Sequence, residues 1–209
     1  MSNGAVGLTH KLILNDCTYL HTSLSGSGNN IETQYNELDK QLVLQSRERV
    51  NNDTWKFSAS TTLNHKFGPR HFNKTGIVYN RHFYSVDNRE AKPLGSALQA
   101  YALEDGNTSS VQAFSQSNIQ IGRKTELDAG LFAHYFGLNN ELSLEPRVGL
   151  KWKFVPGQSF GLAYGLNSRI EMIGFYLARQ QTANGIIQPN KDLRMSKSHH
   201  FGLAWDWLI

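Results

Sequence analysis

The chain has 209 residues, a net charge of +4 and a mean hydropathy of −0.45, although 11% of its residues are aromatic. Its single cysteine, Cys17, excludes an internal disulfide framework. No apolar run reaches the roughly 18 residues that a transmembrane helix needs. No block of lysine and arginine is present, which argues against nucleic-acid binding. The N-terminal stretch lacks the basic and apolar runs of a signal peptide.

Alternating apolar and polar residues predict β-strands along the whole chain, because successive side chains leave a strand on opposite faces. The alternation is clearest in 54–67, where Trp55, Phe57 and Leu63 share one face and Lys56 and Lys66 the other. No segment has a strong helical period. The pattern predicts nine strands, in chain order within 5–14, 18–28, 54–67, 72–86, 109–122, 126–136, 144–154, 158–167 and 198–209.

The connections between these strands alternate between short and long. The short ones are expected near 15–17, 68–71, 123–125 and 155–158, and the long ones at 29–53, 87–108, 138–144 and 170–197. Part of 41–50 is expected to extend a neighbouring strand. Within 155–158, Pro156 and Gly157 suit the centre of a type II turn. Short turns at one end and long loops at the other are typical of outer-membrane β-barrels.

The composition of the two faces favours a membrane barrel over a soluble sheet. Trp55 and Phe67 lie twelve residues apart on one face. At about 3.3 Å per residue and a tilt of about 40°, they span on the order of 30 Å, close to the apolar band of such barrels. The opposite faces carry mostly small neutral polar residues, which suit a wet lumen. Each aromatic residue taken alone is better explained by ordinary strand packing, and it is the recurrence of aromatic residues near strand ends that favours the barrel.

This pattern gives two predicted sets of side chains. The set predicted to face lipid comprises Trp55, Phe57, Leu63, Phe67, Leu127, Leu131, Val148, Leu150, Trp152, Phe154, Phe160, Leu162, Phe201, Leu203 and Trp205. The set predicted to face the lumen comprises Lys56, Lys66, Gln112, Gln116, Arg147, Lys151 and Lys153.

Three segments resemble the barrel of TonB-dependent receptors of Bacteroidetes-type outer membranes. They read LDAGLFAHYFGLNNELSLEPRVGLKWKF, QSFGLAYGLNSRIEMIGFYL and, upstream, RERVNNDTWKFSASTTLNHKF. The resemblance implies a bacterial outer-membrane protein that takes up solutes through a 22-stranded barrel enclosing a plug domain. It also implies outer-membrane lipid, the plug, the remaining strands and TonB as partners, the last through the plug.

Relative to a complete receptor of this kind, the sequence lacks a signal peptide, a plug, a TonB-contacting box and roughly half of the barrel. We therefore expect residues 1–209 to form one partial barrel domain, all-β and antiparallel up-and-down, as a curved open sheet of about nine strands. Its first and last strands are expected to lack their native partners. Such a piece is not expected to transport a solute alone, and the sequence identifies no solute-binding residue.

No residue pattern predicts catalysis, a metal site or a cofactor. His199 and His200 are adjacent, so in a strand they point to opposite faces. None of the serines lies in a G-x-S-x-G turn. Glu145-Pro146-Arg147 is interpreted as the start of a strand, with Arg147 facing the lumen. The lysines of the predicted lumen set could attract anionic solutes or pair with acidic plug residues.

Two alternative functions stay open at this point. A soluble all-β binding or adhesion domain would bury the apolar faces of its strands in one core. A small stand-alone porin-like barrel would pair its first and last strands, although an odd strand count argues against it.

Overall fold

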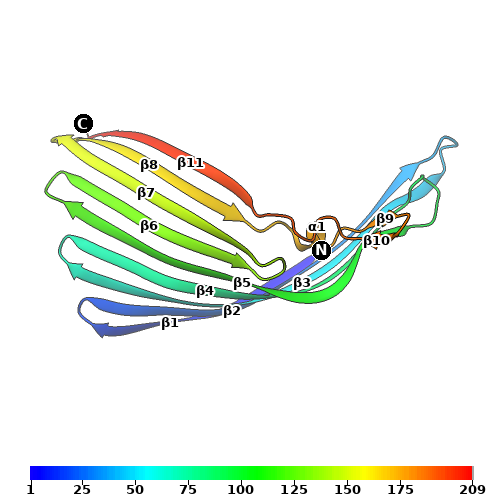
Figure 1. Cartoon of the computed structure of the whole chain (residues 1–209), viewed down its shortest axis with the longest axis horizontal. Coiled ribbons are helices and arrows are strands. Elements are labelled where there is room, and N and C mark those ends of the chain that lie inside the picture. The colour runs from blue at the N-terminus through cyan, green and yellow to red at the C-terminus, as the bar shows by residue number, and fades with distance from the viewer. Residues whose placement is uncertain (209) are drawn as a thin grey trace.

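One antiparallel sheet makes up most of the molecule (Figure 1), and the computed structural model describes residues 1–208. Nine strands form the sheet, and each pairs with the next one along it. The prediction of an all-β, up-and-down architecture is confirmed. The strands are β1 (Ser2–Asn15), β2 (Thr18–Leu38), β3 (Leu44–Gly68), β4 (His71–Glu90), β5 (Gln99–Ile121), β6 (Thr125–Phe136), β7 (Glu141–Val155), β8 (Gln158–Arg169) and β11 (Ser196–Trp207).

The sheet is curved and open. Strands β1 and β11 lie at its two ends and do not pair with each other. The expected open sheet is therefore confirmed, and the described residues do not close a small barrel. The other sheet within 1–208 is the two-stranded pair β9 (Gln180–Thr182) and β10 (Gly185–Ile187), so no second layer forms a sandwich. None of the helical stretches in the described part has the length and apolar character to cross a bilayer.

The four short turns lie together at one end of the sheet, beside the end of β11, and the longer connections lie at the other end (Figure 1). The four predicted short turns are therefore confirmed at one end, whereas at the other end only the connection after β8 is long, and those after β2, β4 and β6 span 39–43, 91–98 and 137–140. In the β7–β8 turn, Gly157 has a φ of 78°, as the third position of a type II turn requires. Val155 pairs with Gln158 across this turn. We call these two ends of the sheet the short-turn end and the long-connection end.

Three of the predicted long loops are wrong, because most of their residues lie in strands. One of them is 138–144: strand β7 begins at Glu141, so the connection after β6 is a turn of four residues, 137–140. Residues 29–38 and 44–53 continue β2 and β3 as a paired ribbon, and Gln34 pairs with Arg49. Strand β4 likewise continues to Glu90 and β5 begins at Gln99. Antiparallel pairing satisfies the backbone hydrogen bonds of these polar segments without requiring an apolar face. The predicted extension within 41–50 is correct from Leu44 onward.

The segment between β8 and β11 is also more ordered than the predicted loop at 170–197. It contains α1 (Ile173–Tyr176) and the β9–β10 hairpin, and we call residues 170–195 the inward segment. Leu177 packs against Tyr84, Val86 and Ala102 of the sheet. A second cluster joins the inward-segment residues Tyr176 and Met195 to Phe136 of β6. The chain therefore crosses one face of the sheet instead of extending into solvent.

Candidate functional site

The two faces of the sheet differ sharply in chemistry. Across four strands, Leu127 pairs with Leu150, Leu150 with Leu162, and Leu162 with Leu203. The neighbouring row joins Trp152, Phe160 and Trp205 in the same way. These rows form an apolar patch over β6, β7, β8 and β11, and its side chains are largely exposed: Leu203, for example, is 71% exposed. The same face, which we call the apolar face, also carries a hydrogen-bonded group of polar side chains over β4 and β5, formed by Asn73, Thr75, Ser115 and Ser117.

Strand register and alternation place every residue of the predicted lipid-facing set on this apolar face. Twelve of the fifteen are exposed, and only Leu127, Phe154 and Phe160 are half-buried. Phe67 lies at a register irregularity, so its contacts decide its face. Its ring centroid is 4.4 Å from that of His65 and 4.7 Å from that of His71, and both histidines lie on the apolar face.

The opposite face, which we call the polar face, buries its polar side chains. Side chains converge on the concave side of a curved sheet, so this crowding identifies the polar face as the concave one. The inward segment packs on the same face, because its contacts Tyr84 and Phe136 belong to it. The buried polar residues of this face include Asn64, Asn88, Thr108, Ser110, His134, Ser143, Glu145 and Ser159.

All seven residues of the predicted lumen-facing set lie on the polar face, but the structure does not bring them into one site. Lys151 and Lys153 line a hollow of about 1080 Å³ at the short-turn end. Gln116 and Arg147 line a smaller hollow of about 450 Å³. Gln112 contacts His134 at 3.4 Å, and the other two members, Lys56 and Lys66, lie apart from these groups.

A network of polar side chains surrounds the buried Glu145 on the polar face, near the β6–β7 turn. The Ser168 hydroxyl donates to Glu145 Oε1 at 2.5 Å, and Arg147 donates to Glu145 Oε2 at 3.2 Å. Arg147 also donates to Asn167 Oδ1 at 2.6 Å. His134 Nδ1 lies 3.9 Å from the carboxylate. Because these side chains come from β6, β7 and β8, the network ties three strands together.

This network contains a serine, a histidine and a glutamate, but its geometry differs from a nucleophilic triad. In a triad the hydroxyl and the carboxylate bind different ring nitrogens of the histidine. Here Ser168 Oγ and Glu145 Oε1 both approach His134 Nδ1, at 3.4 Å and 3.9 Å. Sequence reasoning found Glu145 and Arg147 but missed His134 and Ser168, because only register shows that they are neighbours.

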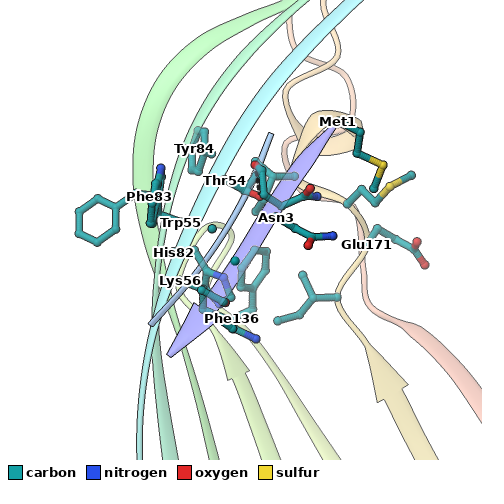
Figure 2. Close-up of a pocket in the computed structure, with 18 residues that line it drawn as sticks. Met1, Asn3, Thr54, Trp55, Lys56, His82, Phe83, Tyr84, Phe136 and Glu171 are labelled. Carbon is teal, nitrogen blue, oxygen red and sulfur yellow. Dashed lines mark hydrogen bonds between the residues drawn. The ribbon is translucent and has the colours of Figure 1, made fainter. Parts of the chain in front are cut away.

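A second feature of the polar face is a hollow of about 670 Å³ beneath the inward segment (Figure 2). Asn3, Lys56 and His82 line it from the sheet, and Glu171 lines it from the connection after β8. Hydrogen bonds from Ser196, and then the Arg169 guanidinium, hold the pKa of Glu171 below its ordinary value. The inward segment, to which Glu171 belongs, therefore bounds the hollow on one side.

The polar groups of this hollow are only partly satisfied. Lys56 has no ion-pair partner within residues 1–208, and the buried Asn29 Oδ1 has no hydrogen-bond partner there. His82 Nε2 lies 3.1 Å from Ser110 Oγ. Across the described residues, no group of histidine, cysteine or carboxylate side chains is arranged to hold a metal ion. The hollow can offer an amide, an ammonium and an imidazole to a polar solute.

The sequence of the chain matches the family described as "TonB dependent receptor-like, beta-barrel" over residues 3–208. No curated protein matches it. Among solved structures, "Copper transporter OprC" is similar with a TM-score of 0.71 and 8% identity, covering 99% of this chain and 36% of that chain. A chain of the FpvAI–pyocin S2 complex has a TM-score of 0.68 and 12% identity, and the match covers 97% of this chain and 29% of that chain. The siderophore receptor PirA from Pseudomonas aeruginosa has a TM-score of 0.59 and 11% identity, and the match covers 99% of this chain and 42% of that chain.

At such identities the solved structures show a shared fold, and this chain spans less than half of each of them. The family match covers nearly the whole chain, and the sheet has the topology of a barrel wall. The chain therefore belongs to the β-barrel family of TonB-dependent receptors and forms part of a receptor barrel in the bacterial outer membrane.

Proposed function

We propose that the apolar face of this chain contacts outer-membrane lipid and that the polar face lines the lumen of the barrel. The observation that supports this most directly is the inverted burial. Leu150, Trp152 and Leu162 are exposed, whereas Ser143 and Glu145 are buried. A soluble domain buries apolar side chains because removing them from water is favourable. In a bilayer the exposed apolar rows contact lipid tails instead.

We further propose that residues 1–209 form a single wall domain that supplies nine strands to a larger receptor. The unpaired backbone groups of β1 and β11 need partner strands, since no water is present in the bilayer core to satisfy them. The partners of this wall are then the remaining strands, outer-membrane lipid, a plug domain and, through the plug, TonB. The whole receptor takes up a solute without catalysing a reaction, and this chain alone does not transport.

In this arrangement the long-connection end faces outside the cell. Strands β2 to β5 then rise above the membrane, and the solute first meets the hollow beneath the inward segment. Protease added to intact cells should cut near the β2–β3 turn at 39–43 and spare the short turns near Pro69 and Pro156. Cleavage confined to the short turns would reverse this orientation.

The assignment of the two faces can be tested by spin labelling along β7. In the full-length receptor carrying Cys17→Ser, single cysteines would replace residues 147 to 152 in turn, and the labelled protein would be studied in lipid bilayers. Collisions with oxygen, which concentrates in lipid, should peak at Val148, Leu150 and Trp152. Collisions with a water-soluble nickel complex should peak at Arg147, Gly149 and Lys151.

The same experiment separates the alternatives. A soluble binding or adhesion domain would be recovered without detergent, and its apolar positions would be protected from both reagents. Collision rates that do not alternate from residue to residue would contradict the proposed faces. So would oxygen collisions that peak at Arg147, Gly149 and Lys151.

A further inference from the structure

Arg81 places a positive charge on the apolar face of the sheet. It lies on β4 and pairs with Phe57 of β3 on one side and with Ser109 of β5 on the other. Its guanidinium carbon lies 5.9 Å from the centroid of the Phe83 ring, and its Nη2 donates to Asn107 Oδ1. Among residues 1–208, no carboxylate forms an ion pair with Arg81. Since arginine stays protonated in proteins, its charge is available to an anion from outside the described part of the chain.

The height of Arg81 along β4 places it at the boundary of the membrane. It is ten residues beyond His71 at the short turn, about 25 Å along the membrane normal at a tilt of about 40°. The apolar band of such a barrel is about 25 Å tall, so Arg81 lies where hydrocarbon gives way to lipid headgroups. Aromatic side chains are typical of this boundary. Four on the same face are between 40% and 60% exposed: Trp55, Phe57, Tyr79 and Phe83.

A hollow of about 450 Å³ opens on the same face beside Arg81. Phe83 and Asn107, which contact the guanidinium, line the hollow on the side nearer the short turns. Asp53 and Asp105 line it on the side nearer the long-connection end. A positive charge and two negative charges therefore follow one another along the membrane normal.

The two aspartates carry negative charge that the described chain does not neutralise. Neither Asp53 nor Asp105 forms an ion pair within residues 1–208. Asp53 accepts a hydrogen bond of 2.7 Å from the Asn30 amide, which is uncharged. The hollow thus presents an arginine to an anion and, further from the hydrocarbon, two carboxylates to a cation.

We propose that this hollow binds the headgroup of a lipid that carries phosphoethanolamine. The inference rests on the proposed function, in which this face contacts lipid and the long-connection end faces outward. In such a lipid the phosphate lies next to the hydrocarbon, and the ammonium lies beyond it on an ethylene bridge. Arg81 then meets the phosphate, and Asp53 and Asp105 meet the ammonium. The charges of the headgroup and of the wall are complementary in sign and in order.

The spacing of the charged groups agrees with such a headgroup. The Arg81 guanidinium reaches Asn107, and Asp105 is two residues further along β5, which is about 7 Å. Guanidinium and phosphate form paired, charge-assisted hydrogen bonds. The ammonium also finds the exposed Trp55 ring beside Asp53, and cations bind the faces of such rings. A phosphate without an ammonium would face the two carboxylates, which repel it.

Native mass spectrometry of the full-length receptor in detergent micelles tests this proposal. The micelles would contain phosphatidylethanolamine or phosphatidylglycerol with the same acyl chains, the second of which has the phosphate but no ammonium. We expect phosphatidylethanolamine to bind about tenfold more tightly, as one charge-assisted contact implies. Arg81→Gln should weaken its binding by about tenfold. Asp53→Asn with Asp105→Asn should remove the preference between the two lipids.

Two charge-removing variants outside the hollow serve as matched controls. Arg89 lies on the same strand as Arg81, but it already pairs with Asp87 at 2.6 Å. Glu32 lies on β2 and pairs with Asn51, away from the hollow. Arg89→Gln and Glu32→Gln should leave both the affinity and the preference unchanged.

Each other outcome counts against the inference. Equal binding of the two lipids, or an equal loss of binding in the control variants, would overturn it. Displacement of the lipid by inorganic phosphate at the same concentration would indicate a site for free anions and would also overturn it. A receptor that migrates as a folded barrel on unheated gels but binds neither lipid refutes the inference alone. A receptor that is recovered without detergent refutes the proposed function as well.

Discussion

Leu150→Arg tests the membrane assignment at the centre of the wall. Leu150 lies on β7 between Leu127 and Leu162, and its side chain is 39% exposed on the apolar face. In the proposed orientation this exposed part contacts lipid tails. Leu142 provides a matched control, because it lies on the same strand and the same face and is 58% exposed.

The expected cost follows from depth in the bilayer. Leu150 is five residues from Val155 at the short turn, about 13 Å along the membrane normal at a tilt of about 40°. This is the middle of an apolar band of about 25 Å. Leu142 lies eight residues further, about 33 Å from the turn, which is beyond the band. Arginine should therefore cost about 2–4 kcal/mol at position 150 and about 0–1 kcal/mol at position 142.

The assay is chemical unfolding of the full-length receptor in lipid vesicles, followed by tryptophan fluorescence and by the shift of the folded band on unheated gels. Leu150→Arg should lower the unfolding midpoint clearly, and Leu142→Arg should change it little. Equal costs at the two positions, or a larger cost at Leu142, would refute the reasoning. A soluble sheet gives no reason for the cost to depend on position along β7 in this way.

Three further changes have defined outcomes. Tyr176→Ala removes a ring that is 1% exposed and should weaken the docking of the inward segment by about 3–5 kcal/mol; limited proteolysis should cut that segment faster, and an unchanged rate would contradict the packing. Gly157→Ala forces a side chain into a φ of 78° and should cost about 1–2 kcal/mol by thermal unfolding; Gly68→Ala, where a Cβ has open space, is the control and should be neutral. Burial and the hydrogen bond to Glu48 raise the pKa of Tyr101, so its contribution to stability is present below pH 10 and is lost as the pH rises above it. Above pH 10, the unfolding midpoint of Tyr101→Phe should therefore fall less steeply with pH than that of the unchanged receptor. Equally steep falls in the two proteins would contradict this linkage.

The parts of the fold within the apolar band could be predicted from sequence because the contrast between faces is strong there. In 148–154, Val148, Leu150 and Trp152 alternate with Gly149, Lys151 and Lys153, and the period of two identifies both the strand and its faces. The open edges were expected from the resemblance, because nine such segments fall short of the 22 strands that it implies. This information lies within single strands, so no knowledge of contacts between distant residues was required.

The parts above the band could not be predicted in the same way. Residues 29–38 and 44–53 are polar on both faces, so a strand and a loop have the same pattern there. The inward segment depends on contacts such as Tyr176 with Phe136, forty residues apart, which alternation cannot indicate. The network of Glu145 with His134 and Ser168 likewise depends on register between strands.

The unequal lengths of the strands make the outer edge of this wall slope. Strand β3 has 25 residues and β4 has 20, whereas β6 and β8 have 12 each. At about 3.3 Å per residue, the difference between β3 and β8 is about 43 Å along the strand. A large soluble molecule, such as an antibody, would therefore touch the tall β2–β5 side before it reached the low side. In the proposed orientation, we expect antibodies raised against intact cells to recognise mainly residues near 32–50 and 88–101.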